Sequence, residues 1–241
     1  MPEELDAATL EEMASLMESR ANMYRVLSRF YREEIDAAFA VDFANDFTFK
    51  SDDAELASAM DELRSSLCRA CDLDVCADVC ADDVSEEGLE QLAVTFDRVF
   101  FGMGPLTARH AFPYESVYTS DKGIMMQDAY AQVVRTYREQ HLAKDPAFRE
   151  PEDHLAVELA FMATLAERTA TFLGEGCEEA ATETVQQQLT FAQGHLLNWL
   201  DRFCADLRKA AEGSFYASLA NATERFIEAD ARLLSEMLVE E

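Results

Sequence analysis

Residues 151–176 read PEDHLAVELAFMATLAERTATFLGEG, and this stretch decides the fold class. Its apolar residues recur at steps of three, four or seven, a spacing that places side chains on one face of an α-helix. This stripe consists of Leu155, Leu159, Met162, Ala166 and Leu173. Pro151 suits the first turn, where its missing N–H is no loss, and Gly174 and Gly176 end the pattern. The stretch therefore predicts one long amphipathic helix.

The same periodicity continues through most of the chain. A first helix carries a stripe formed by Leu10, Met13, Met17, Tyr24, Leu27 and Tyr31. Further helices are expected at residues 36–49, 52–80, 83–100 (opened by a capping box at Asp83–Glu86), 127–142, 178–211 and 214–239. Only 8 Gly and 5 Pro interrupt 241 residues, and no segment alternates with period two for long enough to require a strand. The sequence predicts an all-α, bundle-like fold of roughly eight or more helices.

The whole chain, residues 1–241, is expected to form one helical domain. The expected parts are N-terminal helices over residues 1–142, a hinge loop over residues 143–153, and C-terminal helices over residues 154–241. The hinge is placed where residues 143–150 break the helical pattern.

Charge restricts the class of partner. The chain carries 20 basic and 48 acidic residues, a net charge of −28. Such a surface repels nucleic-acid phosphates and anionic lipid and attracts cationic peptides, although it also serves general solubility. No stretch approaches the roughly 20 apolar residues of a membrane span, and the acidic N-terminus does not resemble a secretory signal. We therefore expect a cytoplasmic protein with reduced cysteines and no stable membrane insertion.

One candidate site lies at residues 150–154, EPEDH, followed by Glu158. Asp153 is expected in the first helical turn, where a carboxylate is favoured by the helix dipole. His154 and Glu158 are spaced i and i+4, so they share a helix face and can form a hydrogen bond. These three side chains could form a general base or half of a metal site, or they could simply cap and pack the start of a helix.

A second candidate is the aromatic loop at residues 113–118, PYESVY, within the longest stretch that lacks helical periodicity. Tyr114 and Tyr118 could cover apolar side chains of a peptide while Glu115 binds a guanidinium, or the rings could anchor the loop to the core. His195 and Trp199, the single tryptophan, lie one helical turn apart and could belong either to the core or to a site.

The cysteines Cys68, Cys71, Cys76 and Cys80 invite a zinc interpretation. They all lie along one expected helix, however, whereas structural zinc sites draw Cys pairs from separated elements, so we expect helix packing and neither metal nor cofactor. The chain also lacks a Gly-rich phosphate loop, a G-x-S-x-G elbow and an H-E-x-x-H motif. We therefore expect no enzyme, with a metal-assisted centre at Asp153, His154 and Glu158 as the alternative.

Four segments together resemble the TorD/DmsD family of redox-enzyme maturation chaperones. They are the first helix from Arg20 through Tyr24 to Tyr31, the loop PYESVY at 113–118, the motif EPEDH at 150–154, and HLLNWLDRF at 195–203. The third segment is similar to the family's Pro-Asp-His hinge motif, with one extra residue between Pro151 and Asp153. The Cys cluster lies outside the family pattern.

The resemblance implies a cytoplasmic chaperone. Such a protein binds the twin-arginine leader or the apo form of a molybdenum-containing oxidoreductase subunit, aids cofactor insertion and delays export. The leader-binding residues implied are Tyr114, Glu115, Ser116, Tyr118, Asp153 and His154, with Glu158, His195 and Trp199 in support. The resemblance also implies a homodimer formed by domain swapping at the hinge. The alternative is a helical scaffold that assembles with a folded redox partner.

Overall fold

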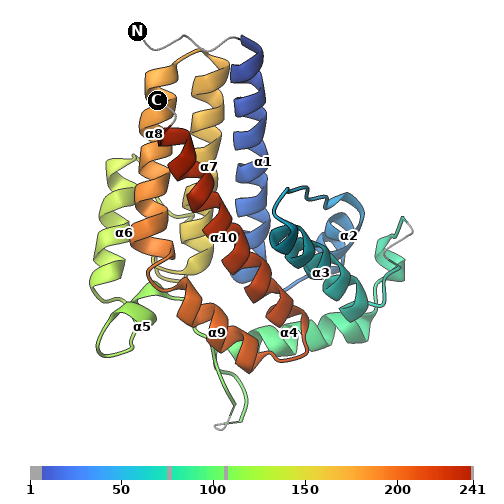
Figure 1. Cartoon of the computed structure of the whole chain (residues 1–241). Coiled ribbons are helices and arrows are strands. Elements are labelled where there is room, and N and C mark those ends of the chain that lie inside the picture. The colour runs from blue at the N-terminus through green and yellow to red at the C-terminus, as the bar shows by residue number, and fades with distance from the viewer. Residues whose placement is uncertain (1–6, 75–77, 106–107, 240–241) are drawn as a thin grey trace. The chain divides into compact units, whose positions relative to one another are not determined.

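The computed structural model describes residues 7–74, 78–105 and 108–239, and helices are the regular elements of these ranges. The chain is 71% helical, which confirms the predicted all-α class. The helices are α1 (Ala7–Arg32), α2 (Ala37–Asp46), α3 (Ala54–Ala70), η1 (Ala81–Asp83), α4 (Glu86–Phe100), α5 (Glu115–Thr119), α6 (Asp128–Glu139), α7 (Leu155–Gly174), α8 (Glu178–Phe191), the π-helix η2 (Ala192–Leu196), α9 (Leu200–Ala210) and α10 (Phe215–Val239) (Figure 1).

Contacts group the chain into two compact units. The first unit contains α1, the chain from Tyr114 to Trp199, and the end of α10 from Ile227. The second contains residues Glu33–Pro113 and Leu200–Phe226. The single chaperone domain with a hinge at 143–153 stays a prediction. Within the ranges described, none of the helices combines the length and the apolar character that crossing a membrane demands.

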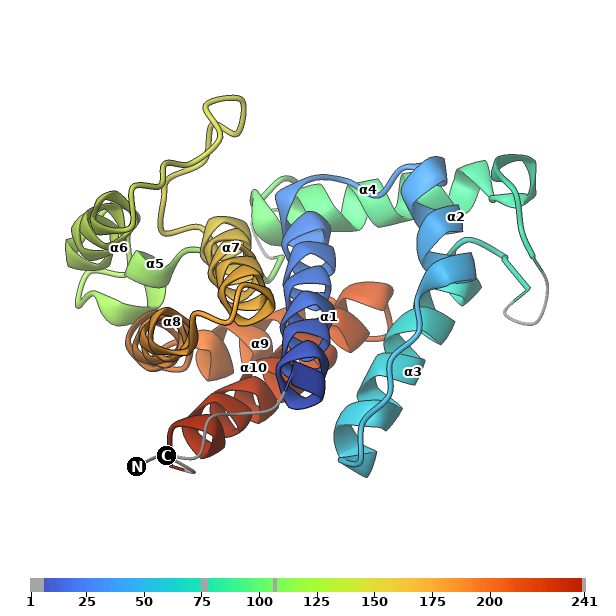
Figure 2. The same ribbon diagram turned by 90° about the horizontal axis from the view of Figure 1, so that it is seen from above.

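The core of the first unit lies between α1 and α7, which run antiparallel with α8 beside α7 (Figures 1 and 2). The stripe predicted for α7 is buried at all five positions, and that of α1 is buried from Met17 onward. The hydroxyl of Ser28 on α1 donates a 2.7 Å hydrogen bond to the carbonyl of Ala156, close to the start of α7. The apolar stripes thus fix which faces meet, and this hydrogen bond fixes the longitudinal position of the two helices.

A buried ion pair joins the end of α10 to α1. Nε and Nη2 of Arg20 donate to the two carboxylate oxygens of Asp230 at 2.5 and 2.8 Å, and the Tyr24 hydroxyl donates to Asp230 at 2.6 Å. Burial opposes the Arg20 charge, but the carboxylate more than compensates and keeps the pKa of Arg20 above its usual value. Arg20 and Tyr24, two residues of the family-like first helix, therefore have a structural role.

The second unit corrects the predicted helix at 52–80. Helix α3 ends at Ala70, and Asp72 adopts a positive φ of 56° that an α-helix cannot continue. Cys68 is on the helix and Cys71 is its C-cap; both are buried, whereas Cys80 is exposed beside η1. Cys76 lies outside the described residues. The cysteines that the structure describes therefore do not share one helix.

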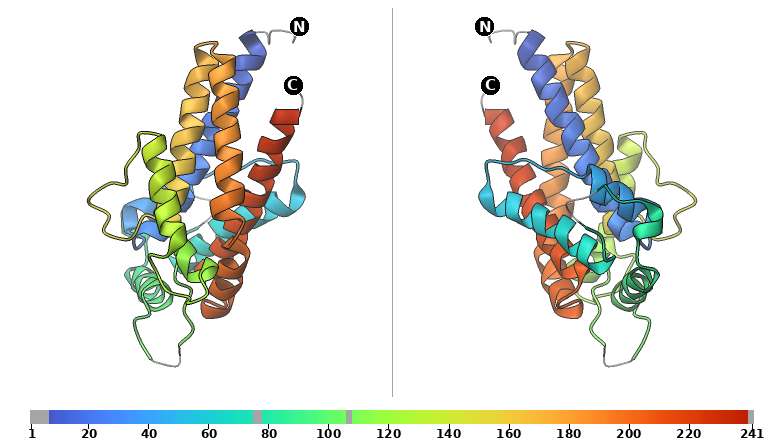
Figure 3. Two further views of the ribbon diagram at one scale, coloured as in Figure 1. Left: turned by 90° about the vertical axis from the view of Figure 1, so that its left-hand side faces the viewer. Right: turned by 90° about the vertical axis from the view of Figure 1, so that its right-hand side faces the viewer.

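Two further expectations about helices are wrong. The predicted helix at 178–211 is interrupted after Phe191 by the π-helix η2, after which α9 starts at Leu200. The aromatic loop contains the short helix α5, which begins at Glu115. The connection from α6 to α7 is a long segment without helix or strand, consistent with the predicted break at residues 143–150; its role as a hinge stays a prediction (Figure 3).

Candidate functional site

The aromatic loop and the EPEDH motif lie side by side in the first unit. The amide of Glu115 donates a 2.9 Å hydrogen bond to the carbonyl of Asp153, and Tyr114 and His154 form an isolated antiparallel β-bridge. The Tyr114 hydroxyl adds a 2.6 Å hydrogen bond to the carboxylate of Glu150. Two motifs that are about 40 residues apart in the sequence therefore form one site, at the entrances to α5 and α7.

His154 caps α7. Its Nδ1 accepts a 3.1 Å hydrogen bond from the amide of Ala156, and its ring packs edge-on against Tyr114 and Phe148, with centroids 5.1 and 5.2 Å away. Burial, helped by the charge of Lys144, lowers the pKa of His154 to about 3, so the imidazole is neutral near pH 7. The expected hydrogen bond to Glu158 is not formed because Nδ1 is used by the cap.

Asp153 lies just before the helix, not in its first turn, since α7 begins at Leu155. Its Oδ2 accepts a 3.1 Å hydrogen bond from the amide of Ser116, while Oδ1 is buried without a hydrogen-bond partner. Burial raises the pKa of the Asp153 carboxyl, although the Ser116 hydrogen bond opposes this shift. The hydroxyl of Ser116 accepts from the amide of Gln127, which fixes the chain that leads into α6.

The π-helix brings the His195 motif to the same place. The carboxylate of Glu115 contacts Nδ1 of His195 at 3.0 Å and accepts from Nδ2 of Asn198 at 2.8 Å. The indole N–H of Trp199 donates to the carbonyl of His195 at 2.6 Å, and the Tyr118 ring stacks on Trp199 at 5.5 Å. Sequence reasoning missed Asn198. A spacing of three residues places two side chains on one face only in a regular α-helix. The segment around His195 is a π-helix, so the spacing could not have identified Asn198.

Glu158 completes an acidic cluster, which we define as Glu115, Asp153 and Glu158. Their exposed fractions are 1%, 0% and 0%. Neither carboxyl oxygen of Glu158 has a partner of good hydrogen-bond geometry. Burial, followed by the nearby charges of Glu115 and Asp153, raises the pKa of Glu158 well above its usual value. The cluster thus holds three buried carboxyl oxygens without a hydrogen-bond partner of good geometry: Oδ1 of Asp153 and both oxygens of Glu158.

These unpartnered oxygens indicate which kind of ligand the cluster could bind. A ligand rich in N–H donors would satisfy them, because a buried acceptor without a donor costs free energy. Across the ranges that the structure describes, no three His, Cys, Asp or Glu side chains are arranged so that they could hold a metal ion. A guanidinium carries five N–H donors and a positive charge, so its chemistry is of the kind that these oxygens lack.

Comparison with known proteins defines the class. The model of the family described as "Nitrate reductase delta subunit" matches residues 50–205, which is more than half of the chain. The chain therefore belongs to this family, and the relatives that follow confirm its likeness to the TorD chaperones.

Three relatives, each named "Chaperone protein TorD", illustrate the likeness. The protein from Shewanella piezotolerans is 27% identical over 237 residues, covering 90% of this chain and 93% of the relative. Those from Photobacterium profundum and Shewanella pealeana are each 28% identical and cover 93% and 97% of this chain and 98% of each relative. These relatives are named as chaperones, which is a non-enzymatic role and agrees with the expectation for this chain.

Proposed function

We propose that this protein is a cytoplasmic chaperone for a molybdenum-containing oxidoreductase subunit. It binds the twin-arginine leader of the apo-subunit, keeps the subunit from export and leaves time for its cofactor to be inserted. The partner is the leader together with the apo-enzyme, and a homodimer formed by exchange at residues 143–153 belongs to the same proposal. The family membership and the relatives named as chaperones support the class.

The observation that carries leader binding is the acidic cluster with its unsatisfied acceptors. An arginine side chain that reached Asp153 and Glu158 would supply N–H donors to the three orphaned oxygens. Its positive charge would also reduce the mutual repulsion of the three carboxyl groups. The net charge of −28 would attract a basic leader before contact.

Access requires a local opening. Tyr114, Glu115 and Ser116 cover Asp153 and are themselves buried, so the leader reaches the cluster when this segment separates from the start of α7. That step breaks the Glu115–Asp153 backbone hydrogen bond, the Ser116–Asp153 and Tyr114–Glu150 bonds, and the β-bridge and ring contact between Tyr114 and His154. The bonds of Glu115 to His195 and Asn198 do not involve α7. Tyr114 and Tyr118 would then cover apolar side chains of the leader, while Trp199 and His195 support Tyr118 and Glu115 from behind.

Calorimetric titration with a twin-arginine leader peptide tests the proposal. The Lys-Lys version of the peptide should bind at least 10-fold more weakly, because an ammonium lacks the planar fork that matches a carboxylate. Asp153→Asn should weaken the twin-arginine peptide by about 10-fold or more and reduce the difference between the two peptides.

Glu183→Gln is the matched control, since Glu183 is an exposed carboxylate on α8 and its loss should change affinity less than about 2-fold. Equal affinity for the two peptides, or no binding of either one, would overturn leader binding through the arginines.

A further inference from the structure

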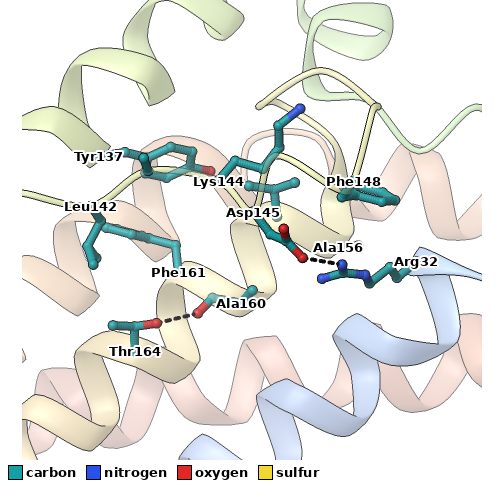
Figure 4. A pocket seen from close by; sticks show the side chains of 12 residues that line it. Arg32, Tyr137, Leu142, Lys144, Asp145, Phe148, Ala156, Ala160, Phe161 and Thr164 are labelled. Atoms are coloured by element: carbon teal, nitrogen blue, oxygen red, sulfur yellow. Dashed lines mark hydrogen bonds and ion pairs between the residues drawn. The ribbon is translucent and has the colours of Figure 1, made fainter.

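We propose that a cavity beside the candidate site binds one large apolar side chain of the leader and so anchors the peptide. This hinge pocket lies wholly within the first unit and has a volume of about 130 Å³. Its lining residues are Arg32, Tyr137, Leu142, Ala143, Lys144, Asp145, Phe148, Ala156, Val157, Ala160, Phe161 and Thr164 (Figure 4). The proposal rests on leader binding and names a second subsite for the same peptide.

The shape of the pocket follows from residue size. The small side chains of Ala156 and Ala160 leave room on one face of α7, with the buried Ala156 on the floor of the pocket and the exposed Ala160 at its rim. Aromatic rings stand around it: Tyr137 and Phe161 meet at 4.7 Å between centroids on one side, and Phe148 lies on another (Figure 4). A cavity of roughly 150 Å³ with apolar walls accommodates benzene. The hinge pocket is therefore the right size for one leucine or phenylalanine side chain and too small for a helix.

The cover of the pocket is a segment without helix or strand, held by a few side-chain contacts. It is formed by residues 143–148, which lack helix and strand and belong to the predicted hinge. Arg32 holds this cover through a 2.7 Å ion pair with Asp145 and by lying 5.1 Å above the Phe148 ring. Both charged groups are more than a third exposed, and such exposed pairs contribute little stability. Lys144 also donates to the carbonyl of Glu150, and Phe148 packs against the ring of His154, so an entering side chain displaces the cover by breaking these contacts as well.

The occupant is argued from continuity with the acidic cluster. Phe148 lines the pocket and packs against the ring of His154, and Tyr137 lines it while lying close enough to Glu158 for that charge to raise its pKa, after burial. The pocket and the cluster therefore share neighbouring side chains, so that one peptide could place an arginine at the cluster and an adjacent apolar side chain in the pocket. A basic and apolar leader carries both kinds of side chain that these adjacent subsites accept.

Filling the pocket tests the inference. Ala160 is exposed at the rim, so Ala160→Phe should place a ring in the cavity while leaving the core intact. Calorimetry should show that Ala160→Phe weakens the leader peptide by about 10- to 100-fold, the worth of burying one large apolar side chain. Ala131→Phe, at an exposed position on α6 outside the pocket, is the matched control and should leave affinity unchanged.

A double-mutant cycle identifies the occupant. Peptides with single Leu→Ala or Phe→Ala changes are titrated against the natural chain and against Ala160→Phe. One change should weaken binding to the natural chain about 10-fold or more and have no further effect on Ala160→Phe. Thermal melting confirms that both variants fold.

Unchanged affinity of Ala160→Phe for a leader that the natural chain binds would overturn only the proposal that the pocket binds a side chain of the leader. Failure of the natural chain to bind the leader overturns the proposed function and the occupant together.

Discussion

At the scale of single residues, the surroundings of Glu158 disfavour its ionised carboxylate. It lies one turn into α7 with no exposed surface, near two further carboxyl groups, and neither of its oxygens has a hydrogen-bond partner of good geometry. Burial is the main reason that its pKa is raised. Because the folded protein holds the Glu158 proton more tightly than the unfolded chain, folding is favoured by the protonated form.

The sign of the pH dependence follows from this shift. Below the unfolded pKa of about 4.3, Glu158 is protonated in both states and its contribution is fully present; that contribution is lost as pH rises through the folded pKa. Glu158→Gln has no proton to lose. Urea unfolding followed by circular dichroism should therefore show a smaller loss of stability between pH 5 and pH 7 in Glu158→Gln. The difference in slope should approach at most about 1.4 kcal/mol per pH unit.

The exposed carboxylate Glu183 provides the comparison for this experiment. Glu183→Gln should follow the pH dependence of the unchanged chain, because an exposed side chain experiences nearly the same solvent in both states. A Glu158→Gln protein that loses as much stability with rising pH as the unchanged chain would show that Glu158 is ionised in the fold.

At the scale of elements, the sequence was sufficient to predict a helix where one face of that helix is apolar. The α7 stripe predicted a long helix ending at Gly174, and α7 is Leu155–Gly174. Its start was less predictable. Asp153 and His154 both suit a helix entrance, and only the burial of the His154 ring against Tyr114 and Phe148 makes the histidine the cap.

A local backbone turn and a tertiary contact explain the two elements that sequence reasoning extended too far. Helix α3 ends at Ala70 because Asp72 turns the backbone to positive φ and the Leu73 amide closes back on the carbonyl of Cys68. The π-helix after Phe191 widens the turn that carries His195, whose ring and the amide of Asn198 meet Glu115 from a distant part of the chain. Local periodicity contains no information about the contact with Glu115. The residues of the site could therefore be named from the sequence, but their contacts with one another could not be predicted.

Gly88 on α4 gives a prediction at this scale. A β-carbon added at Gly88 would lie 2.1 Å from the carbonyl oxygen of Ala70, at the end of α3. The backbone cannot yield without separating the two helices, so Gly88→Ala should destabilise the protein by about 1–3 kcal/mol despite the better helix propensity of alanine. The midpoint of urea unfolding measures the effect.

Gly174→Ala is the matched substitution, because Gly174 also lies in a helix and a β-carbon there meets no atom within 4 Å. It should leave stability unchanged or raise it by up to about 1 kcal/mol. Equal effects of the two substitutions would mean that the close approach of α4 to Ala70 does not constrain the fold.

At the scale of the whole chain, residues far apart in sequence are joined by charge as well as by apolar contact. The acidic cluster takes its members from the aromatic loop and from α7, and it depends on the π-helix for its partners. The Arg20–Asp230 pair spans 210 positions and joins the first helix to the last. A net charge of −28 destabilises the folded chain through mutual repulsion. Buried pairs of opposite charge counteract part of this repulsion.

Asp230→Asn should therefore be strongly destabilising. The substitution leaves the Arg20 guanidinium buried without its counter-charge, which costs about 3–5 kcal/mol. Arg25 of α1 offers an internal comparison because it pairs with Glu167 of α7 at the surface, where Glu167→Gln should cost less than about 1 kcal/mol. Urea unfolding of both variants at one pH gives the two values. A loss below about 1 kcal/mol for Asp230→Asn would mean that water reaches Arg20 and that apolar packing alone joins α10 to α1.

The double change Arg20→Met with Asp230→Leu separates the contribution of charge from that of packing. It removes both ions and should recover most of the stability lost in Asp230→Asn.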